Sequence, residues 1–191
     1  MTGSEPARAA GGRLRSPAST SHPAASTAST ASTASTVSAA LGTADGAVPE
    51  GVTVFDDELP AVANLDPDLL GALRRAATDA AGDGVEFCVN GGWRSPQYQE
   101  NLLQGAISKY GSAKEAARWV ATAEKSLHVS GHAIDIGHSD ARAWLSKHGA
   151  EYGLCQIYRN EPWHYELRPE AIDRGCPPMY ADPSHDPRLR Q

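Results

Sequence analysis

Apolar residues recur every three or four positions in several stretches of the chain, and this spacing predicts amphipathic helices. The clearest stretch reads "LDPDLLGALRRAATDAAG", where Asp66 can cap the amino end, Pro67 takes the first turn and Gly82 follows the last apolar residue. Similar start and stop signals frame "SPQYQENLLQGAISKYG", "SAKEAARWVATAEK" and "SDARAWLSKHGAEYG". We therefore expect a helix in each of these stretches.

Short apolar runs between these helices predict β-strands. In "VEFCVNGG", Val85, Phe87 and Val89 alternate with other residues, and "HAIDIG", "LCQIY" and "WHYEL" are similarly short. The last two runs follow each other along the chain with a very short link, which favours antiparallel pairing. Helices that flank a few short strands indicate an α+β fold with a small mixed or antiparallel sheet.

The first part of the chain has a different composition. The repeat "ASTSHPAASTASTASTASTVSAA" has almost no large apolar side chains, so it cannot bury enough surface to offset the entropy lost on ordering. We expect residues 1–47 to be disordered and residues 48–191 to form one domain. Arg8, Arg13 and Arg15 could begin an export signal, yet Ser and Thr interrupt the apolar run that such a signal needs.

The charge balance and the hydropathy pattern narrow the choice of partners. The 191 residues include 17 Lys+Arg and 23 Asp+Glu, a formal charge of −6. A mildly acidic chain lacks the basic surface that nucleic acids require, so we expect no nucleic-acid partner. The sequence has no run of about 18 apolar residues, the length that a membrane span needs, so we expect no integral membrane segment. We further expect a monomer.

Three cysteines, Cys88, Cys155 and Cys176, leave at least one thiol outside any disulfide within the chain. None forms a CxxC pair, so a cysteine zinc site is not expected. One disulfide would suit an exported protein, and the sequence does not decide which two cysteines form it.

Histidines and carboxylates gather in "SLHVSGHAIDIG" and "NEPWHYEL". Asp135 falls in an apolar strand, where an ionised carboxylate needs a cation nearby. Small residues upstream allow a turn that returns His128 toward Asp135. In the second stretch, a strand would place His164 and Glu166 on one face, with Glu161 at its start.

Two imidazoles and one carboxylate leave a divalent metal with an open position, which is typical of a catalytic zinc site. His128, Asp135 and His164 are therefore candidate zinc ligands. Glu161 is the candidate base that takes a proton from the zinc-bound water and later protonates a leaving amine. Arg94, in "GGWRSPQYQ", can offer charge and hydrogen bonds to a substrate carbonyl or carboxylate.

At these residues the sequence resembles the zinc D-alanyl-D-alanine carboxypeptidases of the VanY type, which are related to the VanX dipeptidases. "SLHVSGHAID" fits the pattern S-x-H-x-x-G-x-A-x-D, and "EPWH" fits E-x-W-H. "GGWRSPQYQ" is similar to G-[YW]-R-S-x-x-x-Q. The patterns occur in the family's order and span about Val85 to Leu167.

The resemblance implies the fold shared with the Hedgehog signalling domain and removal of the terminal D-Ala from peptidoglycan stem peptides or precursors ending in D-Ala-D-Ala. It assigns His128, Asp135 and His164 as the zinc ligands and Glu161 as the catalytic acid and base. Arg94 would stabilise the oxyanion or bind substrate, and Gln99 and Ser126 would contact the substrate. The implied substrate places the protein in the cell envelope or outside the cell. Because no clear export signal is present, a cytoplasmic location is the alternative.

One departure from the family concerns the stretch before "EPWH". The link "LCQIYRN" is short, whereas many VanY-like proteins carry a longer loop there. A short link predicts a more open substrate wall and favours a longer stem peptide over a dipeptide.

Other functions remain open at the level of the sequence. The enzyme could be a D,D-dipeptidase, or an L,D- or endopeptidase, that cleaves a different bond of peptidoglycan. A non-catalytic zinc-binding cell-wall module is a second alternative, although Glu161 and Arg94 argue against it. The same three ligands would also suit a non-haem iron oxygenase, which needs no counterpart of Glu161. Taken singly, each histidine also fits an ordinary core or surface role, and Arg94 an ordinary salt bridge.

Overall fold

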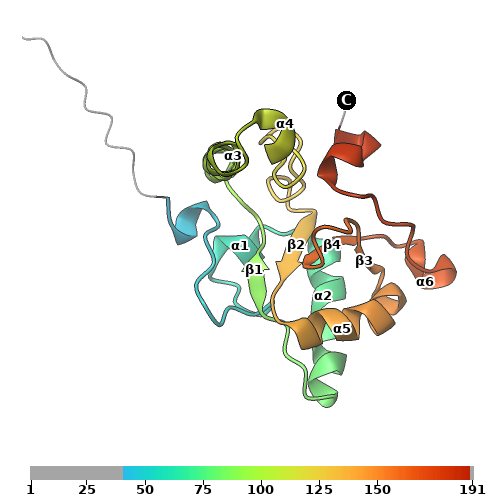
Figure 1. The fold of residues 1–191 in the computed structure, drawn as a ribbon. Coiled ribbons are helices and arrows are strands. Elements are labelled where there is room, and N and C mark those ends of the chain that lie inside the picture. Colours follow the sequence, from blue (N-terminus) through green and yellow to red (C-terminus); the bar gives the residue numbers. More distant parts are fainter. Residues whose placement is uncertain (1–40, 190–191) are drawn as a thin grey trace, which may run out of the picture. The chain divides into compact units, whose positions relative to one another are not determined.

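A four-stranded sheet lies at the centre of residues 41–189, the part of the chain that this computed structural model describes. The strands follow the order β1-β2-β4-β3, and each neighbouring pair is antiparallel. Their bounds are β1 (Val89–Gly91), β2 (Ala133–Ile136), β3 (Leu154–Gln156) and β4 (His164–Leu167). Helices surround the sheet (Figure 1), so the predicted α+β class is confirmed, and the sheet is antiparallel rather than mixed.

The helix α2 (Pro67–Gly82) has the predicted start and end and supplies an apolar face to the core. The side chain of Asp66 caps it by accepting hydrogen bonds of 3.0 and 3.1 Å from two backbone N–H groups of the first turn. Leu69 and Leu73 are buried in one cluster with Tyr165 of the sheet. Burial of these apolar side chains holds the helix against the strands that carry the polar site.

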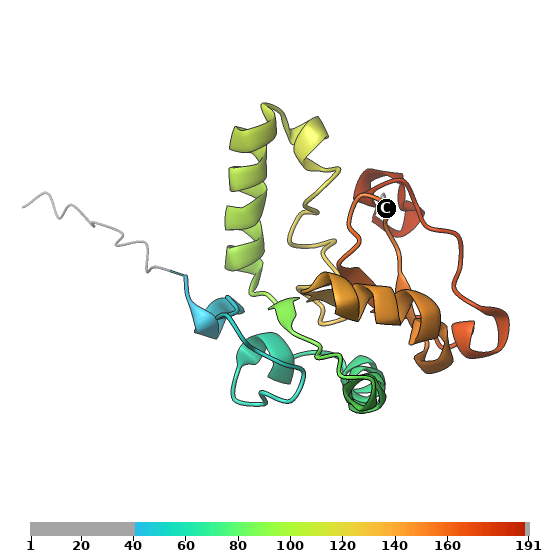
Figure 2. The ribbon, with the colours of Figure 1, turned by 60° about the horizontal axis from the view of Figure 1, so that its bottom comes forward.

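Of the other helices, α3 is nearly as long as α2, and the rest are shorter. They are α1 (Pro60–Ala63), α3 (Pro96–Tyr110), α4 (Ala113–Ala116), α5 (Ser139–His148), α6 (Ala171–Arg174) and the 3-10 turns η1 (Thr43–Asp45), η2 (Gly149–Tyr152), η3 (Pro183–His185) and η4 (Pro187–Leu189). Ser95 caps α3 by accepting a 3.1 Å hydrogen bond from the Tyr98 backbone. The helices α3 and α4 lie side by side and project away from α2 and α5 (Figure 2).

The helix expected in "SAKEAARWVATAEK" is much shorter than predicted. Its capping Ser112 accepts the hydrogen bond expected from the Glu115 backbone, yet α4 ends at Ala116. Two carbonyls that would continue the helix are taken by side chains from elsewhere. Asn160 donates to the Arg118 carbonyl at 2.8 Å, and Gln99 donates to the Ala121 carbonyl at 2.9 Å. Tertiary contacts thus replace the helix here.

The strand expected from Val85 begins only at Val89. The backbone N–H of Val85 instead closes the end of α2 by donating to the Ala80 carbonyl at 3.0 Å. Cys88 forms an isolated bridge with Thr53 rather than a ladder. The predicted helix 139–153 likewise changes after His148 into the tighter turn η2.

The structure describes the chain from residue 41, which lies within the segment 1–47 that the sequence predicts to be disordered. Within it, η1 contacts the rest of the domain, because Ser95 donates from its backbone to the Asp45 carbonyl at 2.8 Å and from its hydroxyl to the Asp45 carboxylate at 3.1 Å. The folded region therefore starts before Val48. The rest of that segment, with the three arginines, lies outside the described residues.

No helix within residues 41–189 is long and apolar enough to cross a bilayer.

The C-terminal residues 176–189, named here the C-terminal strap, are tied to the domain at several points. A disulfide joins Cys155 in β3 to Cys176, and Cys88 remains a buried free thiol. Tyr180 donates from its backbone to the Ile157 carbonyl at 2.9 Å. Further along, Asp182 accepts a 3.1 Å hydrogen bond from the Arg118 guanidinium. The strap thus bridges the sheet and the region that follows α4.

Candidate metal centre

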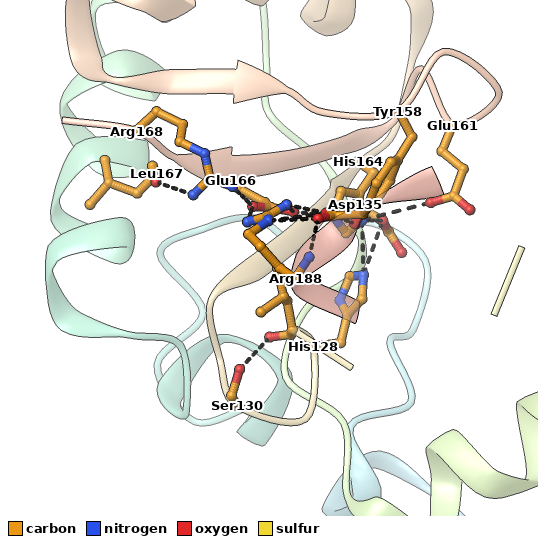
Figure 3. Close-up of polar contacts among 12 residues, drawn as sticks. His128, Ser130, Asp135, Tyr158, Glu161, His164, Glu166, Leu167, Arg168 and Arg188 are labelled. Carbon is orange, nitrogen blue, oxygen red and sulfur yellow. Dashed lines mark hydrogen bonds and ion pairs between the residues drawn. The ribbon is translucent and has the colours of Figure 1, made fainter. Parts of the chain in front are cut away.

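The sheet brings two of the predicted ligands face to face. Asp135 of β2 and His164 of β4 are direct cross-strand partners. His128 comes from the turn before β2, and its Nδ1 lies 2.9 Å from the Gly92 carbonyl. A hydrogen bond donated there turns the other ring nitrogen, Nε2, toward the two strands (Figure 3).

The three side chains present their ligand atoms in a small triangle. His128 Nε2 lies 3.2 Å from His164 Nδ1, and each of these nitrogens lies 3.4 Å from Asp135 Oδ1. A tetrahedral zinc with bonds of about 2.0–2.1 Å has ligand atoms about 3.3–3.4 Å apart, because a tetrahedron's edge is about 1.6 times its bond length. The measured triangle therefore matches the face of such a coordination sphere.

The carboxylate of Asp135 is divided between two tasks. Its Oδ2 accepts a 2.6 Å hydrogen bond from the Arg94 guanidinium. Its buried Oδ1 accepts no hydrogen bond from any residue in the described range. Burial alone would raise the pKa of this carboxyl group, but the two imidazoles and Arg94 hold the pKa well below its ordinary value. An orphaned carboxylate oxygen between two imidazole nitrogens is the position that a divalent cation would satisfy.

The two histidines differ in their electrostatic surroundings. Burial, helped by the nearby Arg94, lowers the pKa of His128, so that ring is neutral and offers a lone pair. Burial acts the same way on His164, but the carboxylates of Asp135 and Glu166 outweigh it and raise the pKa of His164 to about 9. Metal binding at His164 must therefore displace a proton.

Glu161 lies beside this triangle with its carboxylate almost enclosed. Its side chain is 7% exposed, and Oε2 lies 3.8 Å from His164 Nδ1. The other oxygen, Oε1, has no hydrogen-bond partner among residues 41–189. Burial raises the pKa of Glu161 to about 7, with the charge of Asp135 adding to the effect. A carboxyl group with this pKa can both accept and donate a proton near neutral pH.

The remaining predicted site residues line one cavity of about 280 Å³ together with the triangle. Arg94 contributes to its wall while it binds Asp135. Gln99 is fixed within the protein, since its carbonyl accepts from Arg94 at 3.2 Å and its amide donates to Ala121. Gln99 therefore contacts Arg94 at the cavity wall, and its expected contact with substrate stays a prediction. Ser126 is buried at the cavity wall.

Apolar side chains form the rest of the cavity wall. Leu102 and Trp119 line it from the α3–α4 side, and Trp163 lines it from the residue before β4. Pro183 and Leu189 of the C-terminal strap also line it. The short link between β3 and β4 predicted a more open wall, but the strap packs on that link and supplies part of the wall itself.

Three residues near the site were missed by the sequence reasoning. Glu166 lies behind His164, with Oε1 3.3 Å from His164 Nε2. Arg188 contacts Glu166, and the ring of Tyr158 lies 4.9 Å from the ring of His164. The shared strand face of His164 and Glu166 was the available signal for the first residue. The local sequence around Arg188 holds no comparable signal, because the contact joins residues 22 apart in the chain.

Comparison with known proteins adds a family assignment to this geometry. The family model VanY, D-alanyl-D-alanine carboxypeptidase, matches residues 62–170, which hold all the predicted site residues. No curated protein matches the chain.

Solved structures of similar fold include three with named ligands or activities. VanYB in complex with D-Alanine-D-Alanine is 24% identical, with 58% of this chain and 74% of that chain covered and a TM-score of 0.53. The LdcB LD-carboxypeptidase is 22% identical over 66% of this chain and 70% of that chain, with a TM-score of 0.53. A mutant of the vancomycin resistance D,D-pentapeptidase VanY from a VanB-type cassette, in complex with Zn(II), is 24% identical over 54% of this chain and 72% of that chain, with a TM-score of 0.50. At these identities the three structures establish the fold.

Proposed function

Because the chain belongs to the VanY family of D-alanyl-D-alanine carboxypeptidases, we propose that it removes the terminal D-Ala from peptidoglycan stem peptides that end in D-Ala-D-Ala. The observation that carries the proposal is the triangle of His128, Asp135 and His164 with a buried carboxylate oxygen of Glu161 next to it that has no partner in the described part of the chain. A zinc ion is the metal that this donor set fits. When bound there, zinc supplies Lewis acidity, which makes a water molecule easier to deprotonate and polarises a carbonyl group.

The protein's own residues then divide the work of peptide hydrolysis. Glu161 takes the proton from the attacking water at its carboxylate and returns it to the amine of the departing D-Ala. Its pKa of about 7 suits both halves of that transfer. Arg94 holds Asp135 in place and presents its guanidinium to the cavity, where it stabilises negative charge on the scissile carbonyl oxygen or on the substrate carboxylate. Gln99 keeps Arg94 oriented.

The apolar wall supports a peptide substrate. Leu102, Trp119, Trp163 and the strap residues Pro183 and Leu189 exclude water from one side of the cavity, which strengthens the electrostatic interactions inside it. The disulfide Cys155–Cys176 suits an oxidising compartment and hence an enzyme of the cell envelope or one that is secreted. This location agrees with a peptidoglycan substrate.

The test is release of D-Ala by the zinc-loaded full-length protein from a pentapeptide stem ending in D-Ala-D-Ala. A tetrapeptide whose terminal D-Ala follows an L-residue serves as the parallel substrate, because the fold is shared with both VanYB and the LdcB LD-carboxypeptidase. We expect D-Ala from the pentapeptide, loss of activity on chelation and recovery when zinc is restored. Release from the tetrapeptide alone would assign the L,D reaction instead. A protein with full zinc occupancy that cleaves neither peptide would refute the proposed enzymatic function.

A further inference from the structure

A buried carboxylate stands directly behind one of the proposed zinc ligands. Glu166 is 1% exposed and lies two residues after His164 on the same face of β4. Its Oε1 is 3.3 Å from His164 Nε2, the ring nitrogen that faces away from the triangle (Figure 3). Glu166 therefore accepts a hydrogen bond from His164 Nε2–H, and this makes Nδ1 the nitrogen that binds a metal once its own proton is displaced.

A buried carboxylate in this position needs positive partners of its own, since burying an unpaired charge is costly. Two arginines approach Glu166, and they differ in the oxygen that they reach. Of the two Glu166 oxygens, Arg168 contacts only Oε2, the one that does not face His164. Arg188 contacts both oxygens, with Nη1 2.7 Å from Oε2 and Nη2 3.2 Å from Oε1. Arg188 is thus the arginine that holds the oxygen facing His164.

The C-terminal strap delivers Arg188 to this place and keeps it there. Asp186 is fully buried and accepts 2.9 Å hydrogen bonds from both the backbone N–H and the Nε of Arg188. Asp186 also accepts a 2.9 Å hydrogen bond from the Tyr158 hydroxyl. The Tyr158 ring in turn packs against the ring of His164 with 4.9 Å between ring centres. The strap therefore reaches His164 by two routes, through Glu166 and through Tyr158.

We propose that Arg188 is a positioning residue for the metal centre, which fixes the Glu166 carboxylate so that His164 presents Nδ1 to the ion. The inference rests on the zinc site proposed above and extends it to a residue beyond the region 62–170 that the family model matches. A two-pronged guanidinium–carboxylate contact fixes both the distance and the plane of the carboxylate. A single contact from Arg168 fixes neither in the same way.

The pair of arginines offers a matched comparison. In Arg188→Met the aliphatic stem is kept, and the guanidinium contacts to both Glu166 oxygens and to the Asp186 carboxylate are lost. In Arg168→Met the contact to Glu166 Oε2 is lost, together with a 3.2 Å hydrogen bond to the Leu167 carbonyl, while the contact of Arg188 with Oε1 stays. Loss of the outer partner that contacts a metal-bound histidine weakens metal binding by about 10–100-fold. Arg188 acts one step further out, through Glu166, so we expect Arg188→Met to weaken zinc binding by about tenfold, the lower end of that range, and Arg168→Met by less than about threefold.

The experiment measures the zinc dissociation constant of the full-length parent and both variants by competition with a chromophoric chelator. The visible spectrum of the cobalt-substituted proteins reports the ligand geometry directly, and a purely structural role would leave that spectrum unchanged. Thermal unfolding of the metal-free proteins provides the control for folding. If Arg188→Met unfolds, Arg188→Lys keeps the charge with a single contact, and we expect it to weaken zinc binding by a smaller but measurable factor.

The results separate this inference from the proposed function. Weaker zinc binding and an altered cobalt spectrum in the Arg188 variant, but not in the Arg168 variant, would support it. Equal effects in both variants, or an unchanged Arg188 variant, would overturn it while the peptidase assay on the parent stands. A parent protein that binds no zinc would overturn the inference and the proposed metal site together.

Discussion

Asp135 and His164 stand directly opposite each other on adjacent antiparallel strands, β2 and β4. On the other side of β2, the partner of Asp135 is Gly91 of β1. The site thus runs across three strands, and its geometry depends on their register. A slip of one residue in β4 would turn His164 to the opposite face of the sheet and remove the triangle.

Gly91 can therefore be used to test the site without touching a ligand. A Cβ atom at this position would lie 2.7 Å from Asp135 Oδ2 and 2.8 Å from Arg94 Nη2. We expect Gly91→Ala to displace the Asp135–Arg94 pair, weaken zinc binding and lower kcat/KM by about tenfold or more, because small misplacements in a catalytic site are costly. Zinc titration and peptide hydrolysis check this expectation.

Gly105 provides the control for that substitution. It is exposed within α3, and apart from its chain neighbours and the nearby helix backbone no described atom lies within 4 Å of an added Cβ. Gly105→Ala should leave zinc binding unchanged and stabilise the helix by about 0.5–1 kcal/mol. Unchanged zinc binding in Gly91→Ala would contradict the expectation. It would show that the backbone moves to avoid the clash of the added Cβ and that the Asp135–Arg94 pair stays in place.

The role proposed for Glu161 predicts a loss of rate without loss of metal. Glu161→Gln keeps the size of the side chain and removes its ability to move a proton. We expect kcat for D-Ala release to fall by about 10²–10⁴-fold, while zinc occupancy stays close to that of the parent. Glu170→Gln is the surface control, since Glu170 is exposed. A rate near that of the parent would remove Glu161 from the mechanism.

We expect the carboxylate of Asp182 to make the folded state less stable in acid. Burial opposes ionisation, but hydrogen bonds from Ser184, His185 and Arg118 lower the pKa of Asp182 from 3.8 to about 2. A depressed folded-state pKa stabilises the fold above the unfolded-state value, near pH 4, and this stabilisation disappears as the pH falls through about 2. Because Arg118 and His185 are half exposed, the contribution is at most about 2 kcal/mol.

Unfolding of the parent and of Asp182→Asn by urea, measured from pH 6 down to pH 2, tests this expectation. The parent should be the more stable protein at pH 6, and the difference should shrink toward pH 2. A difference that stays constant over this range would mean that Asp182 acts through its shape and not through its charge.

The disulfide should account for a measurable share of the stability. Cys155 and Cys176 are 21 residues apart, and closing a loop of this length stabilises the folded state by about 3 kcal/mol in the chain-entropy treatment. Replacing both cysteines by alanine should lower the free energy of unfolding by about this amount. A thiol reductant should do the same to the parent and leave the double variant unaffected, and an effect of the reductant on the variant would point to another cause.

The sequence predicted which residues gather at the site better than the length of its elements. Apolar spacing and capping residues were sufficient for α2 and α3, because these signals are local. The predicted length of the helix after Ser112 was too great. The side chains of Gln99 and Asn160 donate hydrogen bonds to backbone carbonyls that a longer helix would use itself. Those hydrogen bonds involve residues more than 20 positions away, which no periodicity can reveal.

The same distinction applies within the site. His128, Asp135, Glu161 and His164 lie in two short stretches, so their convergence followed from one turn and one strand pairing. The role of Arg188 could not be found in this way, because it depends on how the strap folds back over β4. Likewise, the disulfide pairing required the position of Cys176 in space.

The family match ends at residue 170, whereas part of the cavity wall and the guanidinium behind Glu166 come from residues 183–189. A gene fragment trimmed to the region of similarity would encode every proposed zinc ligand and still lack Arg188 and the strap residues that line the cavity. Expression of this protein, and searches for natural relatives with the same architecture, should therefore include the C-terminal strap.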